Sequence, residues 1–406
     1  MGKSLALTLV FLLLATFAGN AAAEVQYTLT DLGTLGGLNS FAFAINNHGQ
    51  IVGESQTTIT GYVGDYHAFL HNGSGPLNRA TDDLGTFGYG GIGTGAKAIN
   101  DSGQVVGFAA IGTGNDPPTR AFLHSGRSPL NRATDDLGTL GGTSSGAYGI
   151  NDIGQVVGWA NTSPAQHAFL RSGSGPLTDL GTFGGTFSCA FGINNVGQIV
   201  GYADTASGAY HAFMHTGAGY LDSRTDDLGT LGGTFSTAVA INDSGWVVGV
   251  SDVNMFTSHA FLHFGSGTLN PATDDLGTLG GNASGANDIN NNGQVVGSSD
   301  TTAYGYPHAF IYYGSGPIQD LNALIPPNSG LTLTTANGIN DLGQIVGCGI
   351  TVDGYGHAFL LTPVPEPSTL ALLAAAVSAL LVYGLRQERK RGEGIFCFKK
   401  GKRGHL

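Results

Sequence analysis

The apolar residues of this chain lie side by side in short runs, and glycine or asparagine separates one run from the next. Val-Val or Ile-Val stands before a glycine, and Ala-Phe stands before an aliphatic residue, so apolar side chains occupy consecutive positions. A sheet with one wet face would alternate apolar and polar residues, so this pattern predicts strands that are covered on both faces. Turn residues bound every run, which indicates that the strands are short.

The same runs recur in seven copies, at a spacing of about 40 to 50 residues that is typical of a propeller or a solenoid. Each copy holds Ile-Asn, a turn ending in Gly, an apolar step such as Val-Val-Gly, an Ala-Phe step usually opened by His, and Asp-Leu-Gly. The Ile-Asn pairs begin at Ile45, Ile99, Ile150, Ile193, Ile241, Ile289 and Ile339. We expect four short strands per copy, with insertions in the loops.

The turn after each Ile-Asn step has a recognisable hairpin composition. Asn100, Asp101, Ser102 and Gly103 suit a type I turn followed by a left-handed residue. All seven copies keep glycine at that place: Gly49, Gly103, Gly154, Gly197, Gly245, Gly293 and Gly343. Only glycine adopts the required positive φ at low cost, so these glycines are expected to serve the backbone rather than a site.

The ends of the repeat region predict how the fold closes. The seventh His-Ala-Phe step begins at His357, and no Asp-Leu-Gly strand follows it. The missing strand stands at the other end, where residues 26–33 read QYTLTDLG. Pairing of this segment with the last copy would remove the exposed edges of a ring. We therefore expect an all-β fold, a seven-bladed β-propeller closed by the N-terminal strand, with an open β-solenoid as the alternative.

The amino terminus has the composition of a secretory signal. Lys3 precedes an apolar run over residues 5–17, and small residues at 21–23 stand before Glu24. This order predicts a signal peptide over residues 1–23, cleaved between Ala23 and Glu24. The propeller of seven repeats is then expected over residues 24–363.

The carboxyl terminus combines a short motif, an apolar stretch and a basic cluster within residues 364–391. The apolar stretch covers residues 370–385, a length that is marginal for a bilayer core of about 30 Å, and it is expected to form a transmembrane helix. A basic stop follows it and should stay cytoplasmic. The stop consists of Arg386, Arg389, Lys390 and Arg391, and a basic tail covers residues 392–406.

This order resembles the PEP-CTERM sorting signal, with its motif at Pro365, Glu366 and Pro367. The resemblance implies that an exosortase recognises the motif and processes the chain there. It also implies an exported protein of the cell surface or extracellular biofilm matrix, transiently anchored in the inner membrane. An ordinary carboxy-terminal membrane anchor is the alternative, and either places the body outside the cytoplasm.

The repeats resemble the HAF family of extracellular repeats, named for His-Ala-Phe. The motif begins at His67, His167, His211, His259, His308 and His357, and Arg120 replaces the histidine in the second copy. The resemblance implies an extracellular location and a propeller-like fold, and it implies no known reaction.

The charge of the chain argues against nucleic acid as a partner, and its cysteines predict no disulfide framework. Residues 24–363 hold seven basic and 25 acidic residues, a formal charge of 7 − 25 = −18. Phosphate binding needs clustered Lys and Arg, so nucleic acid is not expected as a partner. Cys189 and Cys348 lie in different copies, so no disulfide framework follows.

The repeated histidines and acids are not expected to form a catalytic or metal centre. Equivalent histidines of different blades would stand too far apart to share a metal ion, and they are expected to bond the backbone or the neighbouring Asp-Leu-Gly turn. Adjacent acids such as Asp82 and Asp83 point to opposite faces of a strand and make no acid–base couple. We therefore expect no enzyme, cofactor or metal, with an extracellular polysaccharide hydrolase or lyase, or a protein–protein scaffold, as alternatives.

The segments between Val-Val-Gly and His-Ala-Phe carry aromatic and acidic residues. We interpret them as candidate ligand-binding loops on one propeller face, because rings beside carboxylates suit the apolar faces and hydroxyls of sugars. The candidates are Tyr66, Trp159, Tyr202, Tyr210, Asp204, Asp252, Asp300, Tyr304 and Tyr306. Exopolysaccharide is the expected ligand.

Overall fold

The computed structural model describes residues 27–58, 65–88, 93–113, 117–265, 267–302 and 305–364, together with residues 377, 379, 380 and 383. The body, Tyr27–Thr362, forms one compact unit. The predicted signal cleavage site, sorting motif, basic stop and basic tail lie outside the described residues, as do all but four residues of the predicted membrane helix. Within the residues described, no helix has the length and apolarity needed to cross a bilayer.

The body is built from seven repeat units of strands, numbered here in chain order. The first unit contains β2 (Ser40–Ile45), β3 (Ile51–Gln56), β4 (Tyr66–His71) and β5 (Asp83–Gly85). The second contains β6 (Gly95–Ile99), β7 (Gln104–Ala110) and β8 (Thr119–Ser125). The third contains β9 (Ser145–Ile150), β10 (Val156–Asn161), β11 (Gln166–Arg171) and β12 (Thr178–Asp179). Short helices α2 (Arg79–Asp82) and α3 (Arg132–Asp135) precede the last strand position of the first and second units.

The remaining four units follow the same order. They contain β13 (Gly184–Ile193), β14 (Gln198–Thr205), β15 (Tyr210–Thr216) and β16 (Asp227–Gly229); β17 (Ser236–Ile241), β18 (Trp246–Asn254) and β19 (Thr257–Phe264); β20 (Gly280–Ile289), β21 (Val295–Thr301), β22 (His308–Tyr312) and β23 (Gln319–Asp320); and β24 (Leu331–Ile339), β25 (Ile345–Thr351), β26 (Gly356–Pro363) and β1 (Tyr27–Gly33). A 3₁₀ helix, η1 (Leu321–Ala323), follows β23.

Neighbouring strands within a unit are antiparallel, and the first strand of each unit ends at the repeated isoleucine. In the second and fifth units an isolated bridge, made by Asp136 and Asp275, takes the fourth strand position. The turn glycines after Ile-Asn all have φ between +74° and +84°, which confirms the left-handed turn position. The four-strand plan is therefore confirmed in five units, while the second and fifth have three strands and this isolated bridge.

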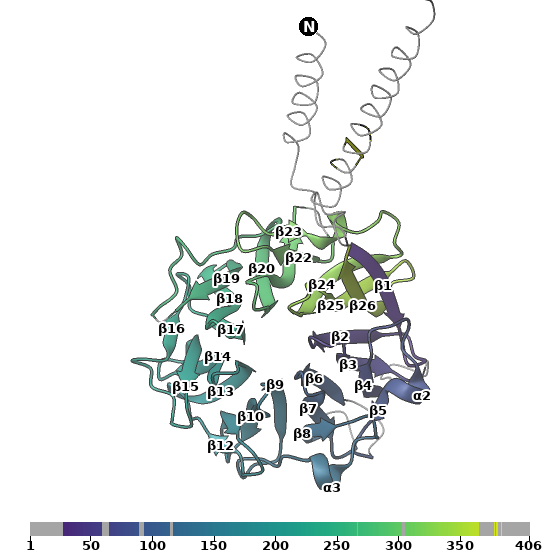
Figure 1. The fold of residues 1–406 in the computed structure, drawn as a ribbon. Coiled ribbons are helices and arrows are strands. Elements are labelled where there is room, and N and C mark those ends of the chain that lie inside the picture. Colours follow the sequence, from purple (N-terminus) through teal and green to yellow (C-terminus); the bar gives the residue numbers. More distant parts are fainter. Residues whose placement is uncertain are drawn as a thin grey trace, which may run out of the picture. The chain divides into compact units, whose positions relative to one another are not determined.

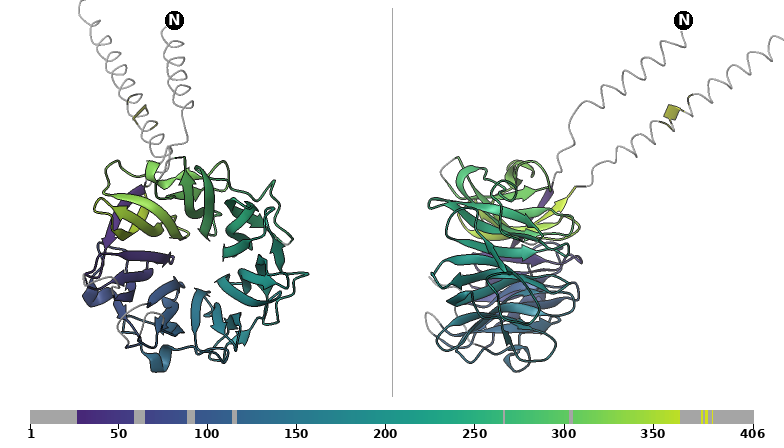
Figure 2. Two further views of the ribbon diagram at one scale, coloured as in Figure 1. Left: turned by 180° about the vertical axis from the view of Figure 1, so that it is seen from behind. Right: turned by 90° about the vertical axis from the view of Figure 1, so that its left-hand side faces the viewer.

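The seven units stand around one axis (Figure 1), and the same ring is visible from behind (Figure 2). The first strand of each unit lies innermost and contacts the first strand of the next: β2, β6, β9, β13, β17, β20, β24 and then β2 again. No sheet in the described residues closes on itself, so closure lies between units rather than within a sheet.

The amino-terminal strand completes the seventh unit, as the sequence predicts. β1 is hydrogen-bonded to β26, and the Thr28 hydroxyl donates to the Thr362 carbonyl at 3.2 Å. His357 pairs with Asp31 as each earlier His-Ala-Phe histidine pairs with an acid of its own unit. Leu32 is fully buried in the core between the seventh and first units. The strand therefore supplies the hydrogen bonds, the polar pair and the apolar side chain that the last repeat lacks.

The core lies between consecutive units. The phenylalanine of every Ala-Phe step is fully buried: Phe69, Phe122, Phe169, Phe213, Phe261, Phe310 and Phe359. The cluster around Val52 and Phe122, for example, draws side chains from the first and second units. Both valines of a Val-Val step are buried, so the strands are covered on both faces, as predicted.

The repeated asparagine forms a closed ring of hydrogen bonds around the axis. Each Nδ2 donates to the carbonyl of the equivalent asparagine in the next unit at 3.0 to 3.1 Å, and the seventh returns to the first. The members are Asn46, Asn100, Asn151, Asn194, Asn242, Asn290 and Asn340, each 3 to 4% exposed. These asparagine hydrogen bonds therefore join every unit to the next.

The residues that follow these asparagines make a second ring. Each backbone N–H donates to the Oδ1 atom of the equivalent residue in the next unit at 2.8 to 2.9 Å. The members are Asn47, Asp101, Asp152, Asn195, Asp243, Asn291 and Asp341. Asn47 and Asn195 also donate their side-chain amide N–H groups to carboxylates of the neighbouring units. The acids of this second ring therefore accept hydrogen bonds that join one unit to the next.

Candidate functional site: the axial cavity

A cavity of about 480 Å³ lies on the axis and is lined by the innermost strands of all seven units. The residue two positions before each repeated isoleucine lines it. These residues are Phe43, Lys97, Tyr148, Phe191, Val239, Asn287 and Asn337. The isoleucine, asparagine and turn glycine are the same in every unit, whereas this cavity position takes five residue types. The ring geometry therefore does not dictate these side chains.

One part of the cavity wall is aromatic. Phe108 and Phe191 lie on either side of Tyr148, with ring centroids 6.4 and 5.3 Å from its own. The series continues outward through Tyr202 and Tyr210, at 5.9 and then 5.5 Å between centroids. Burial raises the pKa of Tyr202 to about 12, so its hydroxyl stays protonated. The outer rings support the rings that line the cavity.

The only lysine of the body lies in this wall. The Lys97 ammonium is 3.5 Å from the centroid of the Phe43 ring and 3.3 Å from the Glu54 carboxylate. The Phe108 ring lies 5.1 Å from the same ammonium. Burial lowers the pKa of Lys97, while Glu54 acts in the opposite sense. The arrangement offers a paired donor and acceptor beside aromatic faces.

The wall from the sixth and seventh units carries amides. The Asn287 side chain donates to the Ala336 carbonyl at 2.9 Å, and Asn337 donates to the Ala42 carbonyl at 2.9 Å. Within the hydrogen bonds described, the Oδ1 atom of Asn287 accepts none from the protein. The cavity thus has aromatic surface in one part and amide groups in another.

Asp288 is the one acid among the cavity residues, at a position where the other units have Ala or Gly. Its carboxylate accepts the backbone N–H groups of Ile289 and Ile339 at 2.9 and 2.8 Å. Burial raises the pKa of Asp288 to about 7, with a contribution from Asp341, against the effect of the two N–H donors. Asp288 therefore joins the sixth unit to the seventh.

The predicted binding loops are corrected in part, because most of the candidates lie in strands. Tyr66, Trp159, Tyr202, Tyr210, Asp204, Asp252 and Asp300 all fall within strands. These strands extend beyond the Val-Val-Gly and His-Ala-Phe motifs, since hairpin pairing continues to residues such as Asp204 and Tyr210. Tyr306 lies in a loop before β22, and Tyr304 lies outside the described residues. Their role in binding stays a prediction.

The structure places these candidates in different surroundings. Tyr202 and Tyr210 belong to the aromatic series, and the Trp159 side chain acts to lower the pKa of Tyr148, against the effect of burial. The buried Asp204 carboxylate accepts the backbone N–H groups of Thr186 and Phe187, both at 2.8 Å. Three candidates are set apart from the cavity: Tyr66 packs on Phe41, Asp252 accepts from the Ser258 hydroxyl, and Asp300 lines an outer pocket with Tyr306.

The His-Ala-Phe histidines are tied to the Asp-Leu-Gly acids, which confirms their expected hydrogen-bonding role. Nδ1 of each lies 2.7 to 3.0 Å from a carboxylate oxygen of the same unit. Arg120, which replaces the second histidine, pairs with Asp136 at 3.7 Å between Nε and Oδ2. The motif therefore joins the third and fourth strand positions.

A second set of histidine–aspartate pairs was not anticipated from the sequence. His71, His124, His215 and His263 are buried, and each Nδ1 lies 2.7 to 2.8 Å from the first acid of an Asp-Asp pair. Their Nε2 atoms are buried without a partner among the described residues. Although burial acts to raise it, hydrogen bonds from Asn78, His71 and Thr81 hold the pKa of Asp82 below 3.8. These pairs are part of the core.

No group of three or more His, Cys, Asp or Glu residues in the described part of the chain is arranged to hold a metal ion. Cys189 and Cys348 are buried and free. Burial raises the pKa of both thiols, to about 12 in Cys348. Neither thiol is therefore ionised at neutral pH.

Two family models match separate parts of the chain. Residues 363–390 match the PEP-CTERM protein-sorting motif, and residues 221–355 match a model described as a protein of unknown function, DUF3466. No curated protein matches the sequence. The sorting motif marks an exported protein that an exosortase processes for the cell surface or the extracellular space. The DUF3466 match begins before β16 of the fourth unit, ends before β26 of the seventh unit, and assigns no activity.

Proposed function

We propose that the body is a seven-bladed β-propeller of HAF-type repeats, displayed outside the cell, that binds a terminal sugar of an extracellular polysaccharide in its axial cavity. The ring of units, the inter-unit asparagine ring and the β1–β26 pairing support the propeller. Before processing, residues 370–385 anchor the chain transiently in the inner membrane. The exported body then contributes to the extracellular matrix.

The observation that carries this proposal is that the residue lining the cavity differs between units, although the rest of the repeat is regular. A sugar ring has apolar C–H faces and hydroxyl edges, so it needs aromatic surface together with fixed polar groups. Phe191 and Tyr148 offer the first, and Asn287 and the Lys97–Glu54 pair offer the second. A volume of about 480 Å³ suits one or two sugar units rather than a long chain.

Binding is favoured over hydrolysis because the carboxylates near the cavity are already engaged. Glycosidases need two carboxyl groups about 5 to 10 Å apart that can reach the glycosidic bond. Glu54 is paired with Lys97, and Asp288 accepts two backbone N–H groups.

Replacement of Phe191 by alanine is expected to weaken sugar binding at least about tenfold. Stacking on an aromatic ring contributes about 0.5 to 1.5 kcal/mol beyond the area that it buries, and about 1.4 kcal/mol corresponds to a factor of ten. The measurement is a glycan array followed by calorimetry with the 24–363 body. Val239→Ala, at the equivalent cavity position, is the matched control and should weaken binding less, because valine offers no ring for stacking. An array without any bound glycan, or equal binding by Phe191→Ala, would contradict the proposal.

A further inference from the structure

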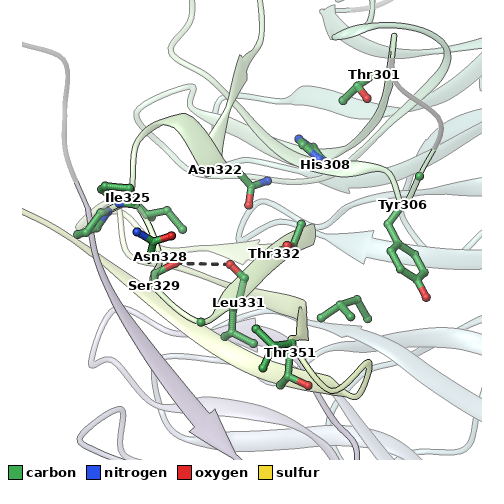
Figure 3. Close-up of a pocket in the computed structure, with 16 residues that line it drawn as sticks. Thr301, Tyr306, His308, Asn322, Ile325, Asn328, Ser329, Leu331, Thr332 and Thr351 are labelled. Carbon is green, nitrogen blue, oxygen red and sulfur yellow. Dashed lines mark hydrogen bonds between the residues drawn. The ribbon is translucent and has the colours of Figure 1, made fainter.

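A groove of about 460 Å³ lies between the sixth and seventh units, away from the axis (Figure 3). It exists because the chain departs from its repeat there. Most units continue from Asp-Leu-Gly into Thr-Leu-Gly-Gly or Thr-Phe-Gly-Gly, whereas residues 320–330 read DLNALIPPNSG. The longer segment forms η1 and a loop that makes one wall of the groove.

Local hydrogen bonds fix this wall. Asn322 donates its side-chain N–H to the Leu333 carbonyl at 2.9 Å and accepts the Leu333 backbone N–H at 2.8 Å. Asn328 has φ of +62°, the one positive value at a non-glycine residue in the described part of the chain. Its left-handed turn follows Pro326 and Pro327 and returns the chain to β24. The wall is held in a defined shape rather than being a free insertion.

Tyr306 stands across the groove from this loop. Figure 3 shows its ring on one side, with Asn328 and Ser329 on the other side and Asn322 and His308 between. Tyr306 is 62% exposed. Residues of β24 and β25 also line the groove. An exposed ring beside fixed amides and hydroxyls is the combination that sugar binding requires.

Among the described residues that line the groove, none is Asp, Glu, Lys or Arg, although the body carries a large negative charge. Its polar groups are threonine and serine hydroxyls, asparagine amides and His308, whose Nδ1 is paired with Asp320 at 2.7 Å. Tyr306 also borders a second pocket of about 400 Å³ that contains Asp300 and Asn282. The two pockets therefore meet at one exposed ring.

We infer that these two pockets form a second binding site, which holds an uncharged segment of a polysaccharide chain stacked across Tyr306. Only the ligand class rests on the proposed function, since the site shares no residue with the axial cavity. Neutral lining favours an uncharged chain, and Asp300 repels an acidic one. Two adjoining pockets suit several consecutive sugar units, whereas the axial cavity suits a chain end.

The test is calorimetry of the 24–363 body with neutral hexasaccharides of glucose, mannose and N-acetylglucosamine, and with a galacturonate hexamer as the acidic probe. At least one neutral hexamer is expected to bind, and Tyr306→Ala should lower its affinity at least tenfold while Tyr306→Phe retains it. Tyr220→Ala is the matched control, because Tyr220 is 73% exposed and lies outside both pockets. Both tyrosines are exposed, so neither change should unfold the body.

Phe191→Ala separates this site from the axial cavity, because it should remove binding of the hexamer's end to the cavity while the binding that depends on Tyr306 persists in the groove. The inference is overturned if no neutral hexamer binds, if the acidic hexamer binds equally well, or if Tyr306→Ala binds as the parent does. Loss of hexamer binding in Phe191→Ala also overturns it, because the cavity would then be the only site. Failure of terminal sugars to bind while the hexamer still depends on Tyr306 would reject the axial proposal alone.

Discussion

A body that starts after Gly33 is expected to lose most of its folding stability. Without β1, the edge of β26 is exposed and His357 loses its carboxylate partner. The fully buried Leu32 and the buried Tyr27 also leave the core. Loss of one buried leucine costs about 2 to 5 kcal/mol, and whole domains are stable by only about 5 to 15 kcal/mol. Chemical denaturation of bodies that begin at residue 24 and at residue 34 measures the difference.

Two point variants serve as a control for this truncation. Leu32→Ala should lower the free energy of unfolding by about 2 to 5 kcal/mol, because it leaves a cavity between the seventh and first units. Thr30→Ala changes a partly exposed position of the same strand and should stay within about 0.5 kcal/mol. Equal stability of the two bodies would show that β1 does not complete the seventh unit.

Asn194→Ala is expected to destabilise the body by about 2 to 5 kcal/mol. The Asn194 side chain donates to the Asn242 carbonyl at 3.0 Å and to Gln198 Oε1 at 2.8 Å, and it accepts the Gln198 backbone N–H at 2.8 Å. Each buried group left without a partner costs about 1 to 3 kcal/mol. Thermal and chemical unfolding of the variant measure the loss.

Asn194→Asp distinguishes hydrogen bonding from side-chain volume. A carboxylate has nearly the same shape but cannot donate to the Asn242 carbonyl, so this variant should be destabilised as well. Asn282, exposed on β20, is the control position, and its replacement by alanine should change the free energy of unfolding by less than about 0.5 kcal/mol. Equal changes in the free energy of unfolding at positions 194 and 282 would show that the asparagine ring does not stabilise the contact between units.

The strand plan and the closure could be predicted because they depend on signals that recur. Each Ile-Asn turn ends in a glycine that needs a positive φ, and the orphan strand with Asp31 matches a partner missing after His357. The asparagine ring was missed although its signal is present. The one residue type kept in all seven turns both joins neighbouring units and bonds its own turn, as Asn194 does with the Asn242 carbonyl and the Gln198 N–H.

The buried histidine–aspartate pairs also had a signal within the chain. The second histidine, such as His71, occurs only in units whose Asp-Leu-Gly step begins with an extra acid, such as Asp82. Units that end the Ala-Phe strand with Arg171, Tyr312 or Leu361 have a single acid. This coupling predicts a pair, because a buried histidine and a buried carboxylate each need a partner.

The axial cavity could not be found by spacing alone. Phe191 and Asn287 occupy the same repeat position, yet the linear pattern does not say which strand of each unit lies innermost or which of its residues face the axis. The sequence predicts loops for the aromatic and acidic candidates because the motif ends at Val-Val-Gly. Hairpin pairing continues for several more residues, so Tyr202 and Asp204 lie in a strand.

Hydrogen–deuterium exchange of the amides in residues 27–33, read by mass spectrometry on the 24–363 body, tests the closed ring most directly. The account predicts slow exchange at the amides of β1 that face β26, because these amides are hydrogen-bonded to that strand, whereas the amides on the outer side of this edge strand exchange faster. Exchange of residues 27–33 within seconds, while β25 and β26 remain protected, would contradict it.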